Sequence, residues 1–298
     1  MSSIKDLLGP MRLPFIILTP ACVVLGLGAA VWKTTAVQIN GFHVVLLFLG
    51  AISAHISVNA FNEYFDFKSG LDFKTNRTPF SGGSGTLPEN PGLAGQALAT
   101  AIATFSITLF LGIYFVTVSG LLLIPLGLLG LFIIYTYTPW LTRNAVLCLI
   151  TPGVGFGTLM VMGTYFVAAG EYSWTAFVAS LIPFFLVSNL LLLNQFPDVE
   201  ADRTIERKHF PITVGKQASS TIYISFLFLT YLTIVGGVYL ELMPKLCLIG
   251  LLTIGMAVPA GIGAYRHADN TEKLIPSMGL NVVINIATPT LVAIGFFF

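Results

Sequence analysis

Long runs of apolar residues, separated by short polar segments, dominate the chain. A helix that crosses the hydrocarbon core of a bilayer needs ~20 mainly apolar residues, and nine runs come close to or exceed this length. They cover residues 12–32, 40–62, 95–118, 120–138, 145–168, 173–195, 218–240, 245–265 and 278–297. The pattern predicts an all-α, multi-pass transmembrane bundle of nine helices. No linker or low-complexity stretch marks a boundary, so residues 1–298 are expected to form a single transmembrane domain.

Composition excludes a water-soluble globule. Of the 298 residues, 55% are hydrophobic and only 9% are charged, whereas soluble domains carry roughly a quarter of their residues as charges. The surface that lacks polar residues must therefore face the lipid bilayer. The N-terminal segment has no short apolar core followed by a cleavage site, so no cleaved signal peptide is expected.

The positive charges lie almost entirely on one side of this topology. If the N-terminus is on side one, every lysine and arginine except Lys33 and Lys245 falls in a segment on that side or at its boundary. Because positive charge near helix ends marks the cytoplasmic face, the N-terminus is predicted to be cytoplasmic. The net charge of +1 and the absence of a basic patch exclude a nucleic-acid partner, and no obligate protein partner is predicted.

Two long cytoplasmic loops, 63–94 and 196–217, are expected to cap the bundle, and each begins with a motif rich in Asn and Asp. In the first motif, Asn62 and Asp66 are i,i+4 neighbours on one helix face. Asp72 lies six residues further, about 240° around the helix. It joins Asp66 only if the chain leaves the helix, which Gly70 allows.

The second motif places Asn194, Asp198 and Asp202 at intervals of four residues. This spacing predicts one stripe on a helix that Pro197 loosens near its end. Carboxylates at the end of an apolar helix are costly unless they are neutralised. Mg²⁺ is usually held by a few carboxylates together with substrate phosphates. Asp66, Asp72, Asp198 and Asp202 are therefore predicted metal ligands, with the amide oxygens of Asn62 and Asn194.

A plainer interpretation of each motif also exists. The acids would then cap helices or pair with Lys68, Arg203 and Lys208 as solvated loop charges. This explanation suits a single motif better than two facing motifs, which favours the metal site.

Cations beside the acids are candidate ligands for a diphosphate. Arg77 precedes a Gly-rich stretch, Ser81 to Gly85, whose amides can approach phosphate oxygens; because the stretch lacks Walker spacing, a flexible turn is an equal alternative for the glycines. Lys68 follows the first motif and Lys208 follows the second. We predict that Lys68, Arg77 and Lys208 bind the diphosphate, although ordinary topology signals explain Lys208 equally well.

These residues resemble the paired Asp-rich signatures of the UbiA superfamily of intramembrane prenyltransferases, and the resemblance spans nearly the whole chain. Asn62, Asp66 and Asp72 match the first signature and Asn194, Asp198 and Asp202 the second, and Arg77 matches its basic residue. The string from Asn62 to Asp72 looks most like the 1,4-dihydroxy-2-naphthoate polyprenyltransferases of menaquinone synthesis. His209-Phe210 departs from the Arg-Thr-like residues of the family, which leaves the acceptor open.

The resemblance implies Mg²⁺-dependent transfer of a polyprenyl group from its diphosphate to an aromatic acceptor, in a prokaryotic cell membrane and on its cytoplasmic side. Asp66 and Asp198 are expected to be catalytic through the metal. Tyr135, in a segment similar to one that contributes a tyrosine to the family's cavity, is expected to stabilise the allylic cation; an aromatic interface anchor is the alternative. A lateral opening between helices is the expected access route.

Other functions remain possible at this stage. A secondary transporter also places acids in a membrane bundle, but its acids tend to lie near the bilayer midplane. A phosphotransferase using a nucleotide-activated lipid needs one compact acidic motif rather than two. Other quinone or tocopherol-type aromatics and a glycerol-phosphate lipid remain alternative acceptors. His55 is interpreted as an interhelical histidine, and the three cysteines, Cys22, Cys148 and Cys247, as small core residues.

Overall fold

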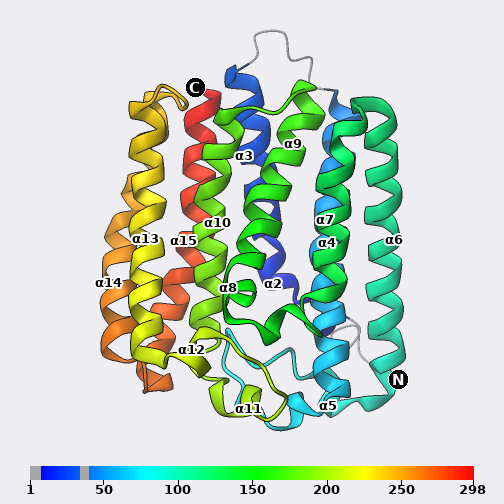
Figure 1. Ribbon diagram of the computed structural model, residues 1–298, viewed down its shortest axis with the longest axis vertical. Coiled ribbons are helices and arrows are strands. Elements are labelled where there is room, and N and C mark those ends of the chain that lie inside the picture. Colours follow the sequence, from blue (N-terminus) through cyan, green and yellow to red (C-terminus); the bar gives the residue numbers. More distant parts are fainter. Residues whose placement is uncertain (1–7, 34–39) are drawn as a thin grey trace.

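The computed structural model describes residues 8–33 and 40–298, and this part of the chain is helical with no strand. The elements run in this order: η1 Gly9–Met11, α2 Leu13–Ile16, α3 Leu18–Lys33, α4 Gly41–Lys68, η2 Leu71–Phe73, α5 Thr86–Glu89, η3 Pro91–Leu93, α6 Ala94–Ser119, η4 Leu121–Leu123, α7 Ile124–Thr136, η5 Leu141–Arg143, α8 Ala145–Gly153, η6 Val154–Leu159, α9 Met160–Ala169, α10 Trp174–Asn194, α11 Val199–Arg203, α12 Phe210–Thr213, α13 Lys216–Tyr239, η7 Lys245–Thr253, α14 Ile254–Arg266 and α15 Thr271–Phe297. The long helices stand side by side as an upright bundle (Figure 1).

Seven helices of the described chain are long and apolar enough to cross a membrane, and the chain is an integral membrane protein. The predicted first and fourth spans correspond instead to two shorter apolar helices, Leu18–Lys33 and Leu121–Thr136. The all-helical prediction is confirmed, whereas the count of nine spans stays a prediction.

Polar residues fix where several helices begin. The side chains of Asn40, Asn144, Ser173 and Asn270 accept hydrogen bonds from backbone amides in the first turns of α4, α8, α10 and α15. Such caps satisfy amides that have no partner within the helix. The cap at Asn270 starts α15 seven residues before the predicted apolar run at 278, so the helix begins earlier than the run indicates. Glu272 and Lys273, outside the run, belong to the first turn of the helix.

Helix α10 forms the centre of the bundle, and about two thirds of the residues in its most apolar stretch are buried. It contacts α3, α8, α9, α13 and α15. Within this core Asn189 donates to the carbonyl of Tyr223, 2.8 Å away, and the Tyr223 hydroxyl donates to Asn281, 3.1 Å away. Polar bonds of this kind hold helices together where the hydrophobic effect between them is weak.

Several of the short elements, α5, α11 and α12, gather at one end of the bundle (Figure 1). Figure 1 shows α5, α11 and α12 at the lower end, with the C-terminus of α15 at the opposite end. The two Asp-rich motifs and their loops therefore meet at a single end. That end is where a charged site can form without exposing its charges to lipid.

Candidate active site

A cavity of about 660 Å³ lies where the two motifs meet. All six predicted metal ligands line it: Asn62, Asp66, Asp72, Asn194, Asp198 and Asp202. The cavity is polar at this end and continues between apolar helices. One ligand can therefore have a charged head at the motifs and an apolar tail inside the bundle.

The first motif has the geometry that its spacing predicts. Helix α4 continues to Lys68, and Asn62 donates to the Asp66 carboxylate at 3.0 Å one turn away. Gly70, with φ of 77°, ends the helix in a left-handed conformation that glycine adopts at little cost. The chain then forms η2, which turns Asp72 back toward the cavity.

The second motif differs from the prediction of one helical stripe. Helix α10 ends at Asn194, residues 195–198 form a turn, and α11 begins at Val199. Pro197 has no amide hydrogen to continue the helical ladder, so the chain leaves the helix there instead of merely loosening. The turn nevertheless keeps Asn194, Asp198 and Asp202 on the cavity.

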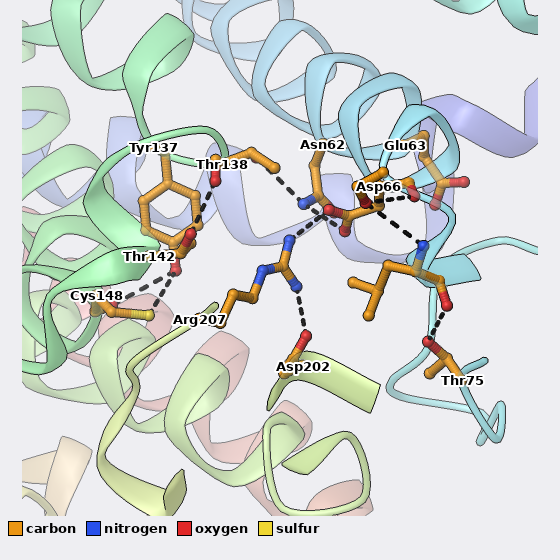
Figure 2. A network of polar contacts seen from close by, with 12 residues as sticks. Asn62, Glu63, Asp66, Thr75, Tyr137, Thr138, Thr142, Cys148, Asp202 and Arg207 are labelled. Atoms are coloured by element: carbon orange, nitrogen blue, oxygen red, sulfur yellow. Dashed lines mark hydrogen bonds and ion pairs between the residues drawn. The ribbon is translucent and has the colours of Figure 1, made fainter. Parts of the chain in front are cut away.

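Arg207 connects the two motifs. Figure 2 shows its guanidinium between the carboxylates of Asp66 and Asp202. It donates to Asp66 through Nη2, and to Asp202 through Nη1 at 2.8 Å. His209 lies 2.9 Å from the other oxygen of Asp202. All four side chains are nearly buried, so these contacts are shielded from water and strong.

A second arginine binds the first motif from the opposite side. Arg12 donates to Glu63 at 2.8 Å and to the amide oxygen of Asn62 at 3.1 Å. Glu63 also accepts from the backbone amide and the hydroxyl of Ser84, at 2.7 and 3.0 Å. Glu63 therefore holds both Arg12 and the Gly-rich loop against the end of α4.

The carboxylates outside the membrane-spanning segments are strongly perturbed. Burial, together with repulsion from Asp66 and Glu63, raises the pKa of Asp72 to about 7. Burial and repulsion from Asp202 raise the pKa of Asp198 to about 7. Burial also acts to raise the pKa of Asp202, but the hydrogen bond from His209 and the charge of Arg207 hold it below its ordinary value. Asp72 and Asp198 are thus only partly ionised near neutral pH, and a further cation beside them would favour their ionised forms.

The site has oxygen atoms that a cation would satisfy. Among the described residues, buried oxygens of Asp72, Asn194 and Asp198 have no hydrogen-bond partner. Among the described residues, the carboxylates of Asp66, Asp72, Asp198 and Asp202 line the cavity together with the guanidinium groups of Arg12 and Arg207 and the imidazole of His209. Glu63, which pairs with Arg12, adds a fifth carboxylate beside them. In this conformation no three acidic, histidine or cysteine side chains of the described chain stand close enough to hold a metal ion.

Four of the predicted residues do not line the cavity. Tyr135 is 54% exposed and packs against Phe61 and Phe65 of α4. Arg77 pairs with Glu89 at 3.0 Å. Lys68 lies over the ring of Tyr64, and Lys208 is exposed. Their positions do not support the roles that the sequence suggested.

The cavity is also lined by charged and aromatic residues that were not predicted as site residues, among them Arg12, Arg207, His209 and Tyr137. Tyr137 is two residues, or about 200° of helical rotation, from Tyr135. It shares a face with Gly127, Gly130 and Ile134, which also line the cavity. Gly127, Gly130, Ile134 and Tyr137 are three or four positions apart, which is the spacing of one helix face. This spacing distinguishes Tyr137, which lines the cavity, from Tyr135. Nothing in the spacing of Arg12, 50 residues before Asn62, indicates its position.

Sequence comparisons find a protein family and relatives that match this chain. The UbiA prenyltransferase family matches residues 18–282. Two relatives are named 1,4-dihydroxy-2-naphthoate octaprenyltransferase. The one from Bacillus subtilis is 29% identical over 64% of this chain, and the match spans 62% of that relative's length. The one from Mycobacterium tuberculosis is 26% identical, over 86% of this chain and 84% of the relative.

Solved structures of the same fold exist at low sequence identity. The apo structure of a UbiA homolog from Aeropyrum pernix K1 superposes with a TM-score of 0.72 at 16% identity, covering 94% of this chain and 97% of that chain. A UbiA homolog from Archaeoglobus fulgidus bound to DMAPP and Mg²⁺ superposes with a TM-score of 0.64 at 15% identity, covering 97% and 99%. Both comparisons support the fold.

Proposed function

The chain belongs to the UbiA prenyltransferase family, and from this premise we propose that it transfers a polyprenyl group from its diphosphate to an aromatic acceptor, 1,4-dihydroxy-2-naphthoate. The observation that carries the proposal is the two-part cavity. Its polar end joins both Asp-rich motifs, and its remainder is apolar. A prenyl diphosphate has the same division between a charged head and an apolar tail. The names of the two relatives support the naphthoate as acceptor.

Mg²⁺ fits the polar end. Asp66, Asp72, Asp198 and Asp202 would hold it, with amide oxygens of Asn62 and Asn194, because hard carboxylate and carbonyl oxygens are its preferred ligands. The buried oxygens of Asp72, Asn194 and Asp198 that have no partner among the described residues support this assignment. When bound, Mg²⁺ neutralises negative charge on the diphosphate leaving group. The homolog from Archaeoglobus fulgidus is bound to Mg²⁺, which supports the choice of ion.

The chain's own residues supply the remaining steps. Arg12 and Arg207 are the guanidinium groups in the cavity, and we assign them to the diphosphate oxygens, which they can bind in pairs. As the allylic C–O bond breaks, its electrons leave with the diphosphate and positive charge develops on the prenyl carbon. The ring of Tyr137 lies on the same cavity and can stabilise that charge. The apolar walls exclude water, which would otherwise capture the cation.

The acceptor then attacks the prenyl carbon through its electron-rich ring. With 1,4-dihydroxy-2-naphthoate, the new C–C bond forms at the ring carbon that carries the carboxylate, and that group leaves as CO₂. The electrons of the broken C–C bond restore the aromatic ring. The product is a demethylmenaquinone in its reduced form. We also propose that the chain spans the membrane nine times, with its N-terminus in the cytoplasm and its active site open to the cytoplasm. The one-sided distribution of lysine and arginine supports this topology.

Pyrophosphate release by purified protein in detergent tests this function. The protein is given a polyprenyl diphosphate, Mg²⁺ or EDTA, and a panel of acceptors that includes 1,4-dihydroxy-2-naphthoate, other phenolic acids and a glycerol-phosphate lipid. We expect Mg²⁺-dependent product with the naphthoate alone. Turnover with another acceptor would retain prenyl transfer but reject this acceptor. No turnover with any acceptor would reject the proposal and favour a transporter.

A further inference from the structure

The cavity is long as well as wide. Its wall on α4 runs from Leu46 to Asp66, and twenty residues of α-helix correspond to about 30 Å at the standard rise. The residues of this wall beyond His55 are small or apolar, such as Ala51 and Leu47. The cavity is therefore a channel that begins at the acids and crosses much of the bundle along α4.

Helices α6, α7 and α9 complete the distant half of the channel, on the side of the bundle where Figure 1 shows α4, α6 and α7. Phe115, Leu123 and Val167 line its far end. Ile113 and Leu128 also line it, yet they are 51% and 62% exposed. The channel therefore reaches the lipid-facing surface along the seam between α6 and α7, and an apolar chain can enter sideways from the bilayer.

Glycines control the width of this channel. Gly153, the last residue of α8, and Gly157, in the π-helical segment η6, both pack against α10. A Cβ added at Gly153 would lie 2.2 Å from a backbone atom of Phe184, and one added at Gly157 would lie 2.5 Å from another. Gly155 lies between them and faces the cavity, and an added Cβ there meets no atom within 4 Å. Gly112 on α6 also lines the cavity, and an added Cβ there likewise meets no atom within 4 Å.

The two glycines stand at different depths. Phe156, the neighbour of Gly155, has its ring 4.6 Å from that of His55, which is eleven residues, or about 16 Å, from Asp66 along α4. Leu111, the neighbour of Gly112, reaches to 3.5 Å from the Cβ position of Gly50, which is sixteen residues, or about 24 Å, from Asp66. Gly155 and Gly112 thus mark two depths of one channel.

Under the proposed function the polyprenyl tail of the donor lies in this channel, and we infer that Gly155 and Gly112 determine how long a tail the channel accepts. The inference rests on the proposed function and specifies its donor. An isoprene unit adds four C–C bonds of ~1.5 Å, or about 4–5 Å of extended length. The tail passes Gly155 after about three units and Gly112 after about five. The full channel accommodates about six, which selects long-chain donors.

Donor preference of two channel variants tests the inference. The purified protein is supplied with geranyl, farnesyl, geranylgeranyl and octaprenyl diphosphate, and the products are separated by chain length. In Gly112→Leu we expect octaprenyl transfer to fall about tenfold or more relative to farnesyl transfer, because overpacking displaces the tail. In Gly155→Leu we expect the loss to begin at geranylgeranyl diphosphate, with geranyl transfer retained. Gly155→Ala should shift the preference less.

Gly236→Leu is the matched control. Gly236 is half-buried within α13, does not line the cavity, and has the same open space at its Cβ position. Its donor preference should equal that of the unsubstituted protein. If both channel variants keep the original preference while short donors are still used, the tail lies elsewhere and lipid fills the channel, which overturns the inference. If the unsubstituted protein uses no donor at all, the proposed function itself fails.

Discussion

The guanidinium of Arg207 donates to the carboxylate of Asp66, a residue 141 positions earlier in the sequence. The same guanidinium binds Asp202 at 2.8 Å, so one side chain neutralises an acid from each motif. Buried carboxylates that face one another repel strongly unless a cation lies between them. Arg207 is that cation in this conformation.

Replacing Arg207 tests its role as an internal cation. In Arg207→Ala the buried charges of Asp66 and Asp202 lose their shared partner, and breaking such a buried ion pair costs about 3–5 kcal/mol. We expect a lower unfolding temperature in EDTA, with much of the loss recovered in saturating Mg²⁺. Thermal unfolding in detergent, with and without Mg²⁺, measures both effects.

Lys208→Ala is the control for that experiment, because Lys208 is the adjacent cation but is exposed and does not line the cavity. Its unfolding temperature should change little in either buffer. An equal destabilisation of Arg207→Ala with and without Mg²⁺ would show that the arginine is structural and is not replaced by the ion.

The second motif contains two acids with opposite expected importance. Asp198 lines the cavity, whereas Glu200 is 83% exposed and pairs with Arg203 on the surface. Asp198→Asn should reduce turnover by about 10²–10³-fold, the usual cost of removing a group that stabilises transition-state charge. Glu200→Gln should retain nearly full turnover. If both variants lost turnover to a similar degree, the overall negative charge of the loop would matter, and Asp198 would not act as a specific ligand of the metal ion.

Two neighbouring tyrosines provide a further test. Tyr137 lines the cavity and Tyr135 faces outward. A cation–π contact of 0.5–2 kcal/mol corresponds to a rate effect of about 2- to 30-fold. Tyr137→Leu is therefore expected to lower the rate of the chemical step within this range, and Tyr135→Leu to leave it unchanged. Single-turnover kinetics with a saturating donor distinguishes the chemical step from binding. The reverse order of the two variants would restore the role that the sequence assigned to Tyr135.

The sequence predicts the bundle closely because apolar length is a strong local signal. The predicted run 145–168 coincides with α8, η6 and α9, and the run 173–195 with α10. The motifs were found because Asn and Asp recur at helical spacing beside apolar runs. Both motifs follow helices that were predicted to end on the same side of the membrane. This prediction was enough to expect that the two motifs meet at one cavity.

The residues that the sequence did not identify depend on tertiary contacts. Arg207 and Lys208 are adjacent cations after one motif, and composition does not distinguish them. The positive φ of 64° at Glu206, and a hydrogen bond that the backbone N–H of Arg207 donates to the carbonyl of Asp202, turn the arginine inward. Arg12 reaches Glu63 only because η1 and α2 fold against α4. Neither contact follows from a regular spacing of residues in the sequence, so neither was predicted.

The stability of the metal-free protein and its stabilisation by Mg²⁺ should depend on pH in opposite directions. In the metal-free protein Asp72 and Asp198 have pKa values of about 7, above the ordinary value for aspartate of ~3.9. Between pH 5 and 7 the folded protein then binds more protons than the unfolded chain, so its stability falls as pH rises. Mg²⁺ binds only the ionised carboxylates, and its affinity rises with pH in the same range. We expect the unfolding temperature in EDTA to fall from pH 6 to pH 8, and the stabilisation by Mg²⁺ to grow. The double variant Asp72→Asn, Asp198→Asn should show neither trend, and a Mg²⁺ effect that is constant over this range would contradict the assignment of these two carboxylates to the ion.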